Sequence, residues 1–136
     1  MIINADGMIL GRLASFVART AQLGENIDIV NCEKAIVTGS RKQVLVNYQQ
    51  KMERGSPFHG PNFPKEANLI VRRTIRGMLP FRQEKGLLAF KRVKCHIGTP
   101  EGLVGKETVK VNEADKSRLQ TKKYITLGEL SRLLGA

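Results

Sequence analysis

Three arginines at helical spacing are the residues best suited to binding chemistry in this sequence. Arg72, Arg73 and Arg76 lie within residues 66–78, where apolar residues recur every three or four positions. At about 100° per residue, the arginines and the apolar residues form separate groups around such a helix. A guanidinium group offers a planar set of N–H donors that grips phosphate oxygens in pairs and stacks on unpaired bases. The segment therefore predicts a surface for a phosphate-rich partner.

The positive charge of the chain is concentrated around these arginines. Lys and Arg number 23 against 12 Asp and Glu, which gives a formal net charge of +11. Residues 41–94 carry 13 basic and three acidic side chains, whereas residues 1–40 carry three and four, and residues 95–136 carry seven and five. A surface built only for solubility mixes both signs throughout, so this asymmetry indicates a contact face for a polyanion. A solvated basic face without a partner is the plainer alternative.

Nucleotide-binding motifs fail at the positions that matter. Gly7 and Gly11 do not satisfy the GxGxxG pattern that lets a backbone approach a pyrophosphate. The residues before Lys106 resemble a Walker motif, but Pro100 stands where the motif needs glycine and Glu107 where it needs a hydroxyl group. An α/β enzyme that uses a nucleotide is therefore a weak hypothesis, and we expect no cofactor.

The histidines and cysteines form no metal-binding or nucleophile pattern. Cys32 and Cys95 stand far apart in the sequence, without CxxC spacing, and His59 and His96 are the only imidazoles. Cys95 adjoins His96, yet neither belongs to a recognisable nucleophile motif. We expect two reduced thiols, with Cys32 packed in a buried strand, no bound metal and no catalytic residue.

Apolar periodicity predicts alternating strands and helices. Apolar runs at residues 2–5 and 27–32 predict strands, and the spacing between them predicts a helix that starts near Leu10 and stops at Gly24. A strand, a helix and a second strand in this order indicate a parallel pair. Further elements are expected as strands at 35–37, 93–97 and near 109–111, and as helices at 66–78 and 86–90.

Two capping boxes mark the starts of further helices. Ser40 with Gln43, and Thr126 with Glu129, have the spacing at which a hydroxyl oxygen accepts a hydrogen bond from the backbone N–H three residues later. The whole chain is expected to be one domain. This RNA-binding domain is expected to span residues 1–136. Within it we distinguish a basic segment at 41–94, a polar excursion at 98–123 and a C-terminal helix near 126–135.

Neither a membrane span nor a secretory signal is expected from the sequence. The purely apolar runs are only a few residues long, whereas a bilayer-spanning helix needs roughly 20 residues. The first residues lack the basic start and apolar stretch of a secretory signal. We expect a cytoplasmic protein with no membrane partner and no small-molecule substrate.

Folded RNA is the polyanion that suits these features best. The segment SPFHGPNFP at residues 56–64 surrounds two aromatic rings with Gly and Pro, which predicts an exposed, semi-rigid loop. Folded RNA is recognised largely through its shape, phosphates and 2′-hydroxyl groups, and such contacts suit a rigid loop beside dispersed cations. No helix-turn-helix, zinc-finger, zipper or RNA-recognition-sheet pattern is present, which favours structural RNA over sequence-specific binding.

Several motifs resemble the universal large-subunit ribosomal protein L13 family. They are GRLASFVA at residues 11–18, IVNCEKAIVTG at 29–39, and IRGMLP at 75–80 followed by KGLLAFKRVKCHIG at 85–98. The resemblance covers about residues 2–100 and is less distinct in the last third of the chain. The first residues and the PFHGPNFP loop resemble the archaeal and eukaryotic branch, and we prefer an archaeal source.

This resemblance implies a fold, a function and a set of contact residues. The fold is an α/β, three-layer α/β/α single domain with a four-stranded parallel sheet. The function is that of a non-enzymatic constituent of the large ribosomal subunit, which binds large-subunit ribosomal RNA, adjoins neighbouring ribosomal proteins and supports early subunit assembly. A regulatory RNA-binding module acting off the ribosome is the alternative. Together with the charge pattern, the expected RNA-binding residues are Arg54, His59, Gly60, Lys65, Arg72, Arg73, Arg76, Gly77, Arg82, Lys91, Arg92 and Lys94.

Overall fold

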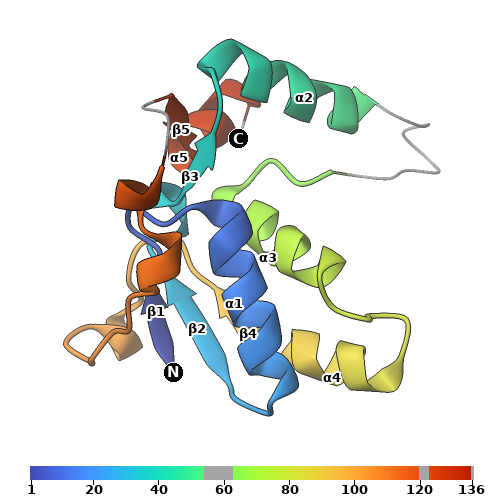
Figure 1. Ribbon diagram of the computed structural model, residues 1–136, viewed down its shortest axis with the longest axis vertical. Coiled ribbons are helices and arrows are strands. Elements are labelled where there is room, and N and C mark those ends of the chain that lie inside the picture. Colours follow the sequence, from blue (N-terminus) through green and yellow to red (C-terminus); the bar gives the residue numbers. More distant parts are fainter. Residues whose placement is uncertain (54–62, 120–122, 136) are drawn as a thin grey trace.

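A parallel sheet lies in the larger part of the molecule (Figure 1). The structure, a computed structural model, describes residues 1–53, 63–119 and 123–135. The sheet has the strand order β1-β2-β4, and its strands are β1 (Ile2–Asn4), β2 (Ile27–Val30) and β4 (Val93–Cys95). β2 pairs in parallel with both neighbours. The parallel pair predicted from the strand, helix, strand order is therefore confirmed.

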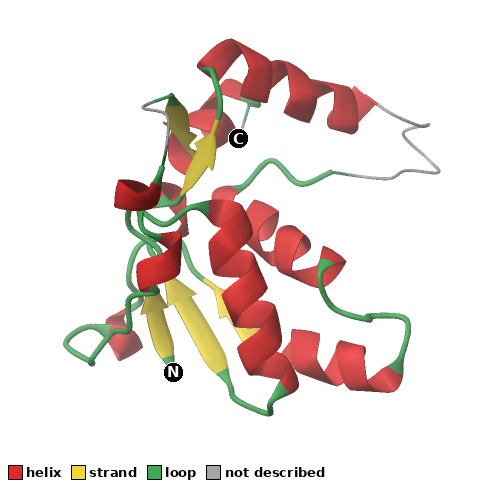
Figure 2. Ribbon diagram, viewed as in Figure 1, coloured by secondary structure: helices red, strands yellow, loops and turns green. Residues whose placement is uncertain are grey.

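Three helices cover one face of this sheet (Figure 2). They are α1 (Leu10–Gln22), α3 (Ala67–Gly77) and α4 (Glu84–Lys91). Ile3, Ile29 and Val93 point toward them from the three strands and are almost completely buried. α1 buries the stripe predicted from its spacing, and Gly24 follows it with a φ of +102°. The Leu and Val side chains of this stripe each contribute about 1.5–3 kcal/mol when buried, and its alanines let α1 approach its neighbours closely, so the stripe fixes α1 on the sheet.

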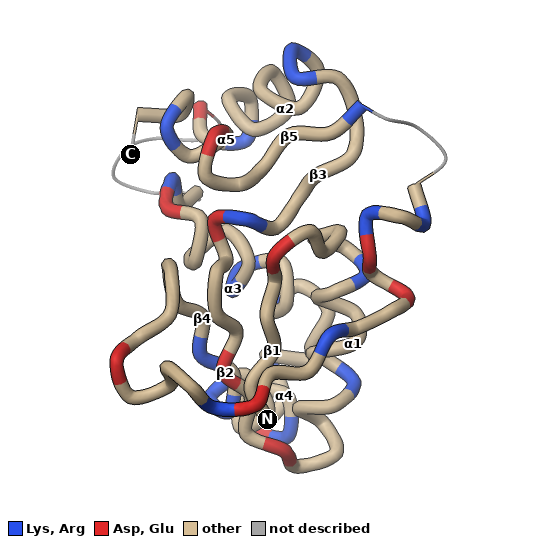
Figure 3. The backbone as a smooth tube through the Cα atoms, turned by 90° about the vertical axis from the view of Figure 1, so that its left-hand side faces the viewer, with Lys and Arg blue, Asp and Glu red and all other residues tan. Residues whose placement is uncertain are grey.

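The other face of the sheet includes charged residues of β2 and β4, strands whose paths Figure 3 shows. Asp28 and Lys94 are register partners on β2 and β4, and Lys94 is exposed. His96, just beyond β4, places its Nε2 atom 3.1 Å from Oδ1 of Asp28. No helix of the described ranges covers this face, so the two faces of the sheet have different environments.

A second sheet is antiparallel and has two strands among the described residues. β3 (Ile36–Thr38) pairs with β5 (Tyr124–Thr126), and α2 (Arg41–Glu53) and α5 (Leu127–Leu133) pack beside them. Oγ of Ser40 accepts a hydrogen bond from the N–H of Gln43, and Oγ1 of Thr126 accepts one from the N–H of Glu129, both at 3.3 Å. Both predicted capping interactions are thus confirmed.

The parallel sheet has three strands among the described residues, not the four that the resemblance implies. β2 ends at Val30 because Asn31 adopts a left-handed conformation, with φ at +57°, and a 3-10 turn follows at Cys32–Lys34. Cys32 is buried but lies in this turn, so its placement in a strand was wrong. The turn directs β3 away from the parallel sheet and toward β5. Near residue 109 only one parallel bridge forms, between Ile3 and Val109, so neither the fourth strand nor the three-layer arrangement is confirmed.

Candidate nucleic-acid interface

Helix α3 presents its arginines on the side away from the core. Its buried residues contact α1 and β4, while Arg72 and Arg73 are half-buried and Arg76 is exposed. The arginines and the apolar stripe therefore occupy different sides of the helix, as their spacing predicted. The buried residues of α3 are Ala67, Ile70, Val71 and Ile75.

Each of these three arginines stacks on an aromatic ring from another segment. The guanidinium carbon lies 4.3 Å from the Phe90 ring centroid for Arg72, 4.6 Å from that of Phe63 for Arg73, and 4.5 Å from that of Phe81 for Arg76. A cation–π contact of this kind is worth about 0.5–1 kcal/mol at an exposed site. The rings therefore orient three long side chains that would otherwise sample many rotamers. We call these three arginines and three rings the α3 arginine surface.

Stacking leaves the N–H edges of the guanidinium groups directed to the sides of the rings. Within the described ranges neither Arg72 nor Arg76 forms an ion pair with a carboxylate. A hollow of about 240 Å³ opens beside them. Its lining consists of Pro64, Leu69, Arg72, Arg73, Arg76 and Phe90. An anion in this hollow would face three cationic side chains.

Lys51 of α2 extends the same surface. Its Nζ atom lies 5.5 Å from the centroid of the Phe63 ring and 4.9 Å from that of Tyr48. Phe63 thus lies between two cations, Lys51 and Arg73. The ring of Tyr48 meets Phe63 edge-on at 5.8 Å, and burial raises the pKa of the Tyr48 hydroxyl.

A glycine fixes how α4 approaches the turn after α3. An ideal Cβ on Gly86 would lie 2.0 Å from the carbonyl oxygen of Pro80. No side chain fits at that distance, so glycine lets α4 pack against the turn. The turn carries Phe81 and α4 carries Phe90, the rings beneath Arg76 and Arg72. Gly86 is therefore a structural requirement of the α3 arginine surface.

The other predicted contact residues are not all on this surface. Lys65, Gly77, Arg82 and Lys91 are exposed and lie before α3, at its end, in the turn before α4 and at the end of α4. Nothing lies within 4 Å of an ideal Cβ on Gly77, so the backbone there is open to close approach.

Arg92 and Lys94 have other surroundings. Nη1 of Arg92 donates a hydrogen bond to the carbonyl oxygen of Ala21 at 2.9 Å, near the C-terminal end of α1. Lys94 lies on the sheet face opposite the helices. The remaining predicted residues, Arg54, His59 and Gly60, lie outside the described residues.

Comparisons with known proteins identify the family of this chain. A family model described as Ribosomal protein L13 matches residues 1–102. The chain is 47% identical to a large ribosomal subunit protein uL13 from Methanosarcina barkeri, over 99% of this chain and 97% of the relative. Proteins of the same name from Methanopyrus kandleri and Archaeoglobus fulgidus are 46% and 44% identical, over 98% of this chain and 86% of each relative. The chain belongs to the ribosomal protein L13 family.

The region that matches the L13 family model contains the parallel sheet, its helices and the α3 arginine surface. The model match ends at residue 102, but the relatives cover nearly the whole chain, including residues 103–119. The similar proteins come from archaea, in agreement with the branch suggested by the first residues and the PFHGPNFP loop.

The Cys95 thiol of this L13-family chain lies in a setting that suppresses its reactivity. A hydrogen bond with Cys32 and burial both raise the pKa of the Cys95 thiol, whereas nearby Arg72 lowers it. A protonated thiol is a poor nucleophile. His96 contacts Asp28 on the other sheet face, so the sequence neighbours Cys95 and His96 do not form a thiol–imidazole pair. The described residues contain no group of three or more metal-ligating side chains.

No helix in the described part of the chain has both the length and the apolar character needed to cross a membrane. Sequence reasoning placed Phe63 in a candidate loop but missed its contact with Arg73, and it missed the contributions of Phe81, Phe90 and Lys51, because these contacts form only through tertiary packing. The proximity of the two thiols was missed for the same reason. No local spacing signals such contacts.

Proposed function

We propose that this protein binds large-subunit ribosomal RNA through the α3 arginine surface and supports early subunit assembly. As a member of the L13 family it is a structural constituent of the large subunit, in the cytoplasmic ribosome, and not an enzyme. The observation that carries the binding proposal is that Arg72, Arg73 and Arg76 each stack on a separate ring and together line one hollow.

The mechanism follows from the geometry of the guanidinium groups. Each stacked arginine offers in-plane N–H donors to phosphate oxygens, and the charge-assisted bonds are about twice as strong as neutral ones. Neutralising RNA phosphates releases their condensed counterions, which makes the affinity fall as salt rises. Because the rings already order the arginines, less side-chain entropy is lost on binding.

The remaining contacts extend this surface along both neighbouring elements. We expect the exposed Lys65, Arg82 and Lys91 to reach further phosphates, and Gly77 to allow a sugar or phosphate close to the backbone. The same assignment is proposed for Arg54, His59, Gly60, Arg92 and Lys94. Neighbouring proteins of the large subunit are the other proposed partners.

A fourth parallel strand beside β1 is also part of the proposal. The N–H of Val109 donates to the carbonyl oxygen of Ile2 at 2.8 Å. The carbonyl oxygen of Val109 in turn accepts a hydrogen bond from the N–H of Asn4 at 3.3 Å. These two bonds supply the first rung of a parallel ladder. We expect residues near 109 to lengthen this pairing in the ribosome, and slower amide exchange there in the assembled subunit than in the isolated chain would support it.

The binding proposal is tested by replacing Arg72, Arg73 and Arg76 together with glutamine. Affinity for large-subunit ribosomal RNA should fall at least about 10-fold, and the salt slope should decrease by about one per lost phosphate contact. The free energy of unfolding should fall by at most about 1.5–3 kcal/mol, from the loss of three cation–π contacts, and the variant should stay folded at the temperature of the binding assay. An unchanged affinity and salt slope would refute the assignment of the site.

Sedimentation separates this function from a regulatory role away from the ribosome. Native lysate is fractionated on a density gradient, and the chain is followed before and after a high-salt wash. Co-migration with the large subunit through the wash is expected. A predominantly free, slowly sedimenting pool would instead favour the regulatory RNA-binding module.

A further inference from the structure

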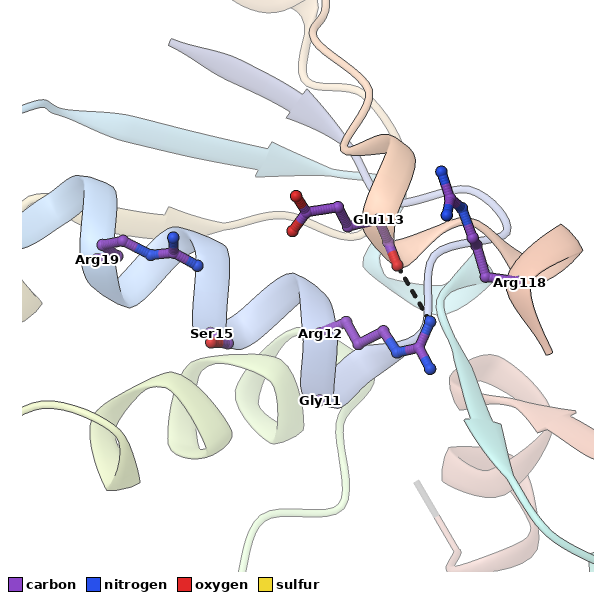
Figure 4. A pocket seen from close by; sticks show the side chains of 6 residues that line it. All are labelled: Gly11, Arg12, Ser15, Arg19, Glu113 and Arg118. Atoms are coloured by element: carbon purple, nitrogen blue, oxygen red, sulfur yellow. Dashed lines mark hydrogen bonds between the residues drawn. The ribbon is translucent and has the colours of Figure 1, made fainter. Parts of the chain in front are cut away.

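A second basic surface lies along α1, on the side away from α3 (Figure 4). A hollow of about 430 Å³ is lined by α1 on one side and by residues 113 and 118 on the other. A neighbouring hollow of about 280 Å³ shares Arg19 and Glu113 with it and adds Lys110. We call the two together the α1 groove. The larger hollow is lined by Gly11, Arg12, Ser15, Arg19, Glu113 and Arg118.

The cations of the α1 groove form no ion pair with a carboxylate of the described residues. Nη1 of Arg12 donates to the backbone carbonyl oxygen of Glu113 at 3.2 Å, a bond that positions the guanidinium group and leaves its charge intact. Arg19 and Arg118 are exposed and form no ion pair with any described residue. The single acidic side chain in the lining is that of Glu113. Three arginines and one lysine therefore outweigh one carboxylate.

The groove connects to the α3 side around the start of α1. A third hollow, of about 360 Å³, shares Gly11 and Arg12 with the groove and reaches Lys51 and Thr74 on the other side. Lys51 stacks on Phe63, a member of the α3 arginine surface. Gly11 lines both hollows, and nothing lies within 4 Å of an ideal Cβ there; we call the uncrowded surface at this residue the passage at Gly11. Basic side chains thus follow a continuous path around one end of α1.

We infer that the α1 groove is a second binding site for the phosphate backbone of RNA, continuous with the α3 arginine surface through the passage at Gly11. Arg12 and Arg19 are seven residues apart on one side of α1, about 10 Å along the helix axis, so they can contact separate phosphates of one RNA strand. The larger hollow lacks the apolar pocket that anchors a typical protein partner, which favours RNA over an acidic peptide. The inference rests on the proposed function, because it assigns more of the same RNA to this chain.

The first test removes the groove charges. Arg12, Arg19 and Arg118 are replaced together by glutamine, and binding to deproteinised large-subunit ribosomal RNA from the organism that encodes the chain is measured between 50 and 300 mM salt. A matched variant replaces Lys42, Lys106 and Arg132, which are exposed and line none of these hollows. The groove variant should lose about 10-fold in affinity and about two units of salt slope, and the matched variant about twofold or less.

The outcomes separate this inference from the function on which it rests. If the α3 glutamine variant loses affinity while the groove variant behaves like its matched control, the groove does not bind RNA and the proposed function stands. If the unaltered chain fails to bind, or the α3 variant binds as well as the unaltered chain, the proposed function itself falls.

Two single substitutions protect the test from an effect of misfolding. Gly11→Gln narrows the passage with a neutral side chain that favours helix more than glycine does, so affinity should fall about threefold or more while the melting temperature is kept or raised. Glu113→Gln removes the one repelling carboxylate, so affinity should rise about two- to threefold. Opposite shifts support the groove as an RNA site. Affinities unchanged in both variants would overturn it.

Discussion

The α3 arginine surface and the α1 groove carry similar charge but are built differently. On α3, three arginines within five residues are ordered by stacking on rings. In the groove, Arg12 and Arg118 come from distant parts of the sequence, and no cation–π contact is observed there among the described residues. Ordering a long side chain costs up to about 2 kcal/mol of entropy, and stacking removes part of this cost before RNA binds. Equal charge therefore need not give equal affinity for RNA. Each cation of the α3 arginine surface should contribute more to RNA affinity than each cation of the α1 groove.

The largest expected effect comes from breaking the support of the α3 surface alone. Gly86→Ala places a Cβ where the backbone of Pro80 lies, so α4 must shift. The free energy of unfolding should fall by about 2–3 kcal/mol, as measured by chemical denaturation. Gly102→Ala is the control, because nothing lies within 4 Å of that Cβ and the change should be under about 0.5 kcal/mol. Equal effects of the two substitutions would mean that α4 can move away from Pro80 without loss of stability, and that Gly86 is not required there.

A second prediction sharpens the comparison at constant charge. Replacing Arg72, Arg73 and Arg76 with lysine keeps three cations but loses the planar forks and most of the stacking on the rings. Affinity for ribosomal RNA should fall about 10-fold, whereas the same replacement of Arg12, Arg19 and Arg118 should cost about threefold or less. The salt slopes should stay within about one unit of the original. Equal losses on the two surfaces would show that stacking adds nothing to binding.

The same comparison explains which parts of the molecule the sequence could predict. The apolar stripes of α1 and α3 follow from local periodicity, and the α3 arginines could be found because their charges lie within one helix. Arg12 and Arg19 were overlooked because residues 1–40 carry more acidic than basic side chains, although the acids do not line the groove. A charge sum over a segment says nothing about which face its charges occupy.

Elements that depend on tertiary contacts were beyond local reasoning. β5 is three residues long and follows a polar stretch, so its pairing with β3 has no signal in hydrophobic alternation. Asn31 interrupts an apolar run by adopting a left-handed conformation, which ended β2 earlier than expected. The rings beneath the arginines come from three separate segments. Phe81 and Phe90 reach their arginines once α4 packs against the turn after α3, and Phe63 reaches Arg73 from the segment before α3.

A third prediction isolates one ring. Phe90→Leu keeps an apolar side chain but removes the face on which Arg72 stacks, so affinity for ribosomal RNA should fall about two- to fourfold with an unchanged salt slope. Phe16→Leu on α1 is the matched control, since Phe16 lines the smaller hollow of the groove without a cation–π contact among the described residues. Fluorescence titration of labelled RNA measures both. A loss as large for Phe16→Leu would contradict a special role for the ring under Arg72.

A fourth prediction concerns the core beneath the α3 arginine surface at alkaline pH. The pKa of the Cys95 thiol is raised above its ordinary value near 9.0, first by its hydrogen bond with Cys32 and then by burial. Because the folded state holds the proton more tightly, this stabilising contribution is complete well below pH 9 and is lost as pH rises and the unfolded thiol ionises. Between pH 8 and pH 9.5 the free energy of unfolding should fall by about 1 kcal/mol from this group.

The control for this effect is Cys95→Ala, measured by urea denaturation at the same two pH values. Removing the thiol should flatten the pH dependence by the amount that Cys95 contributes. The α1 groove has no thiol in its lining, so the loss of stability at high pH should be local to the α3 side. The increase in amide exchange should be larger in β4 and α3 than in residues 110–118. If the substituted protein keeps the full pH dependence, groups other than Cys95 cause the loss of stability. If amide exchange rises equally on both sides of α1, the two surfaces unfold together.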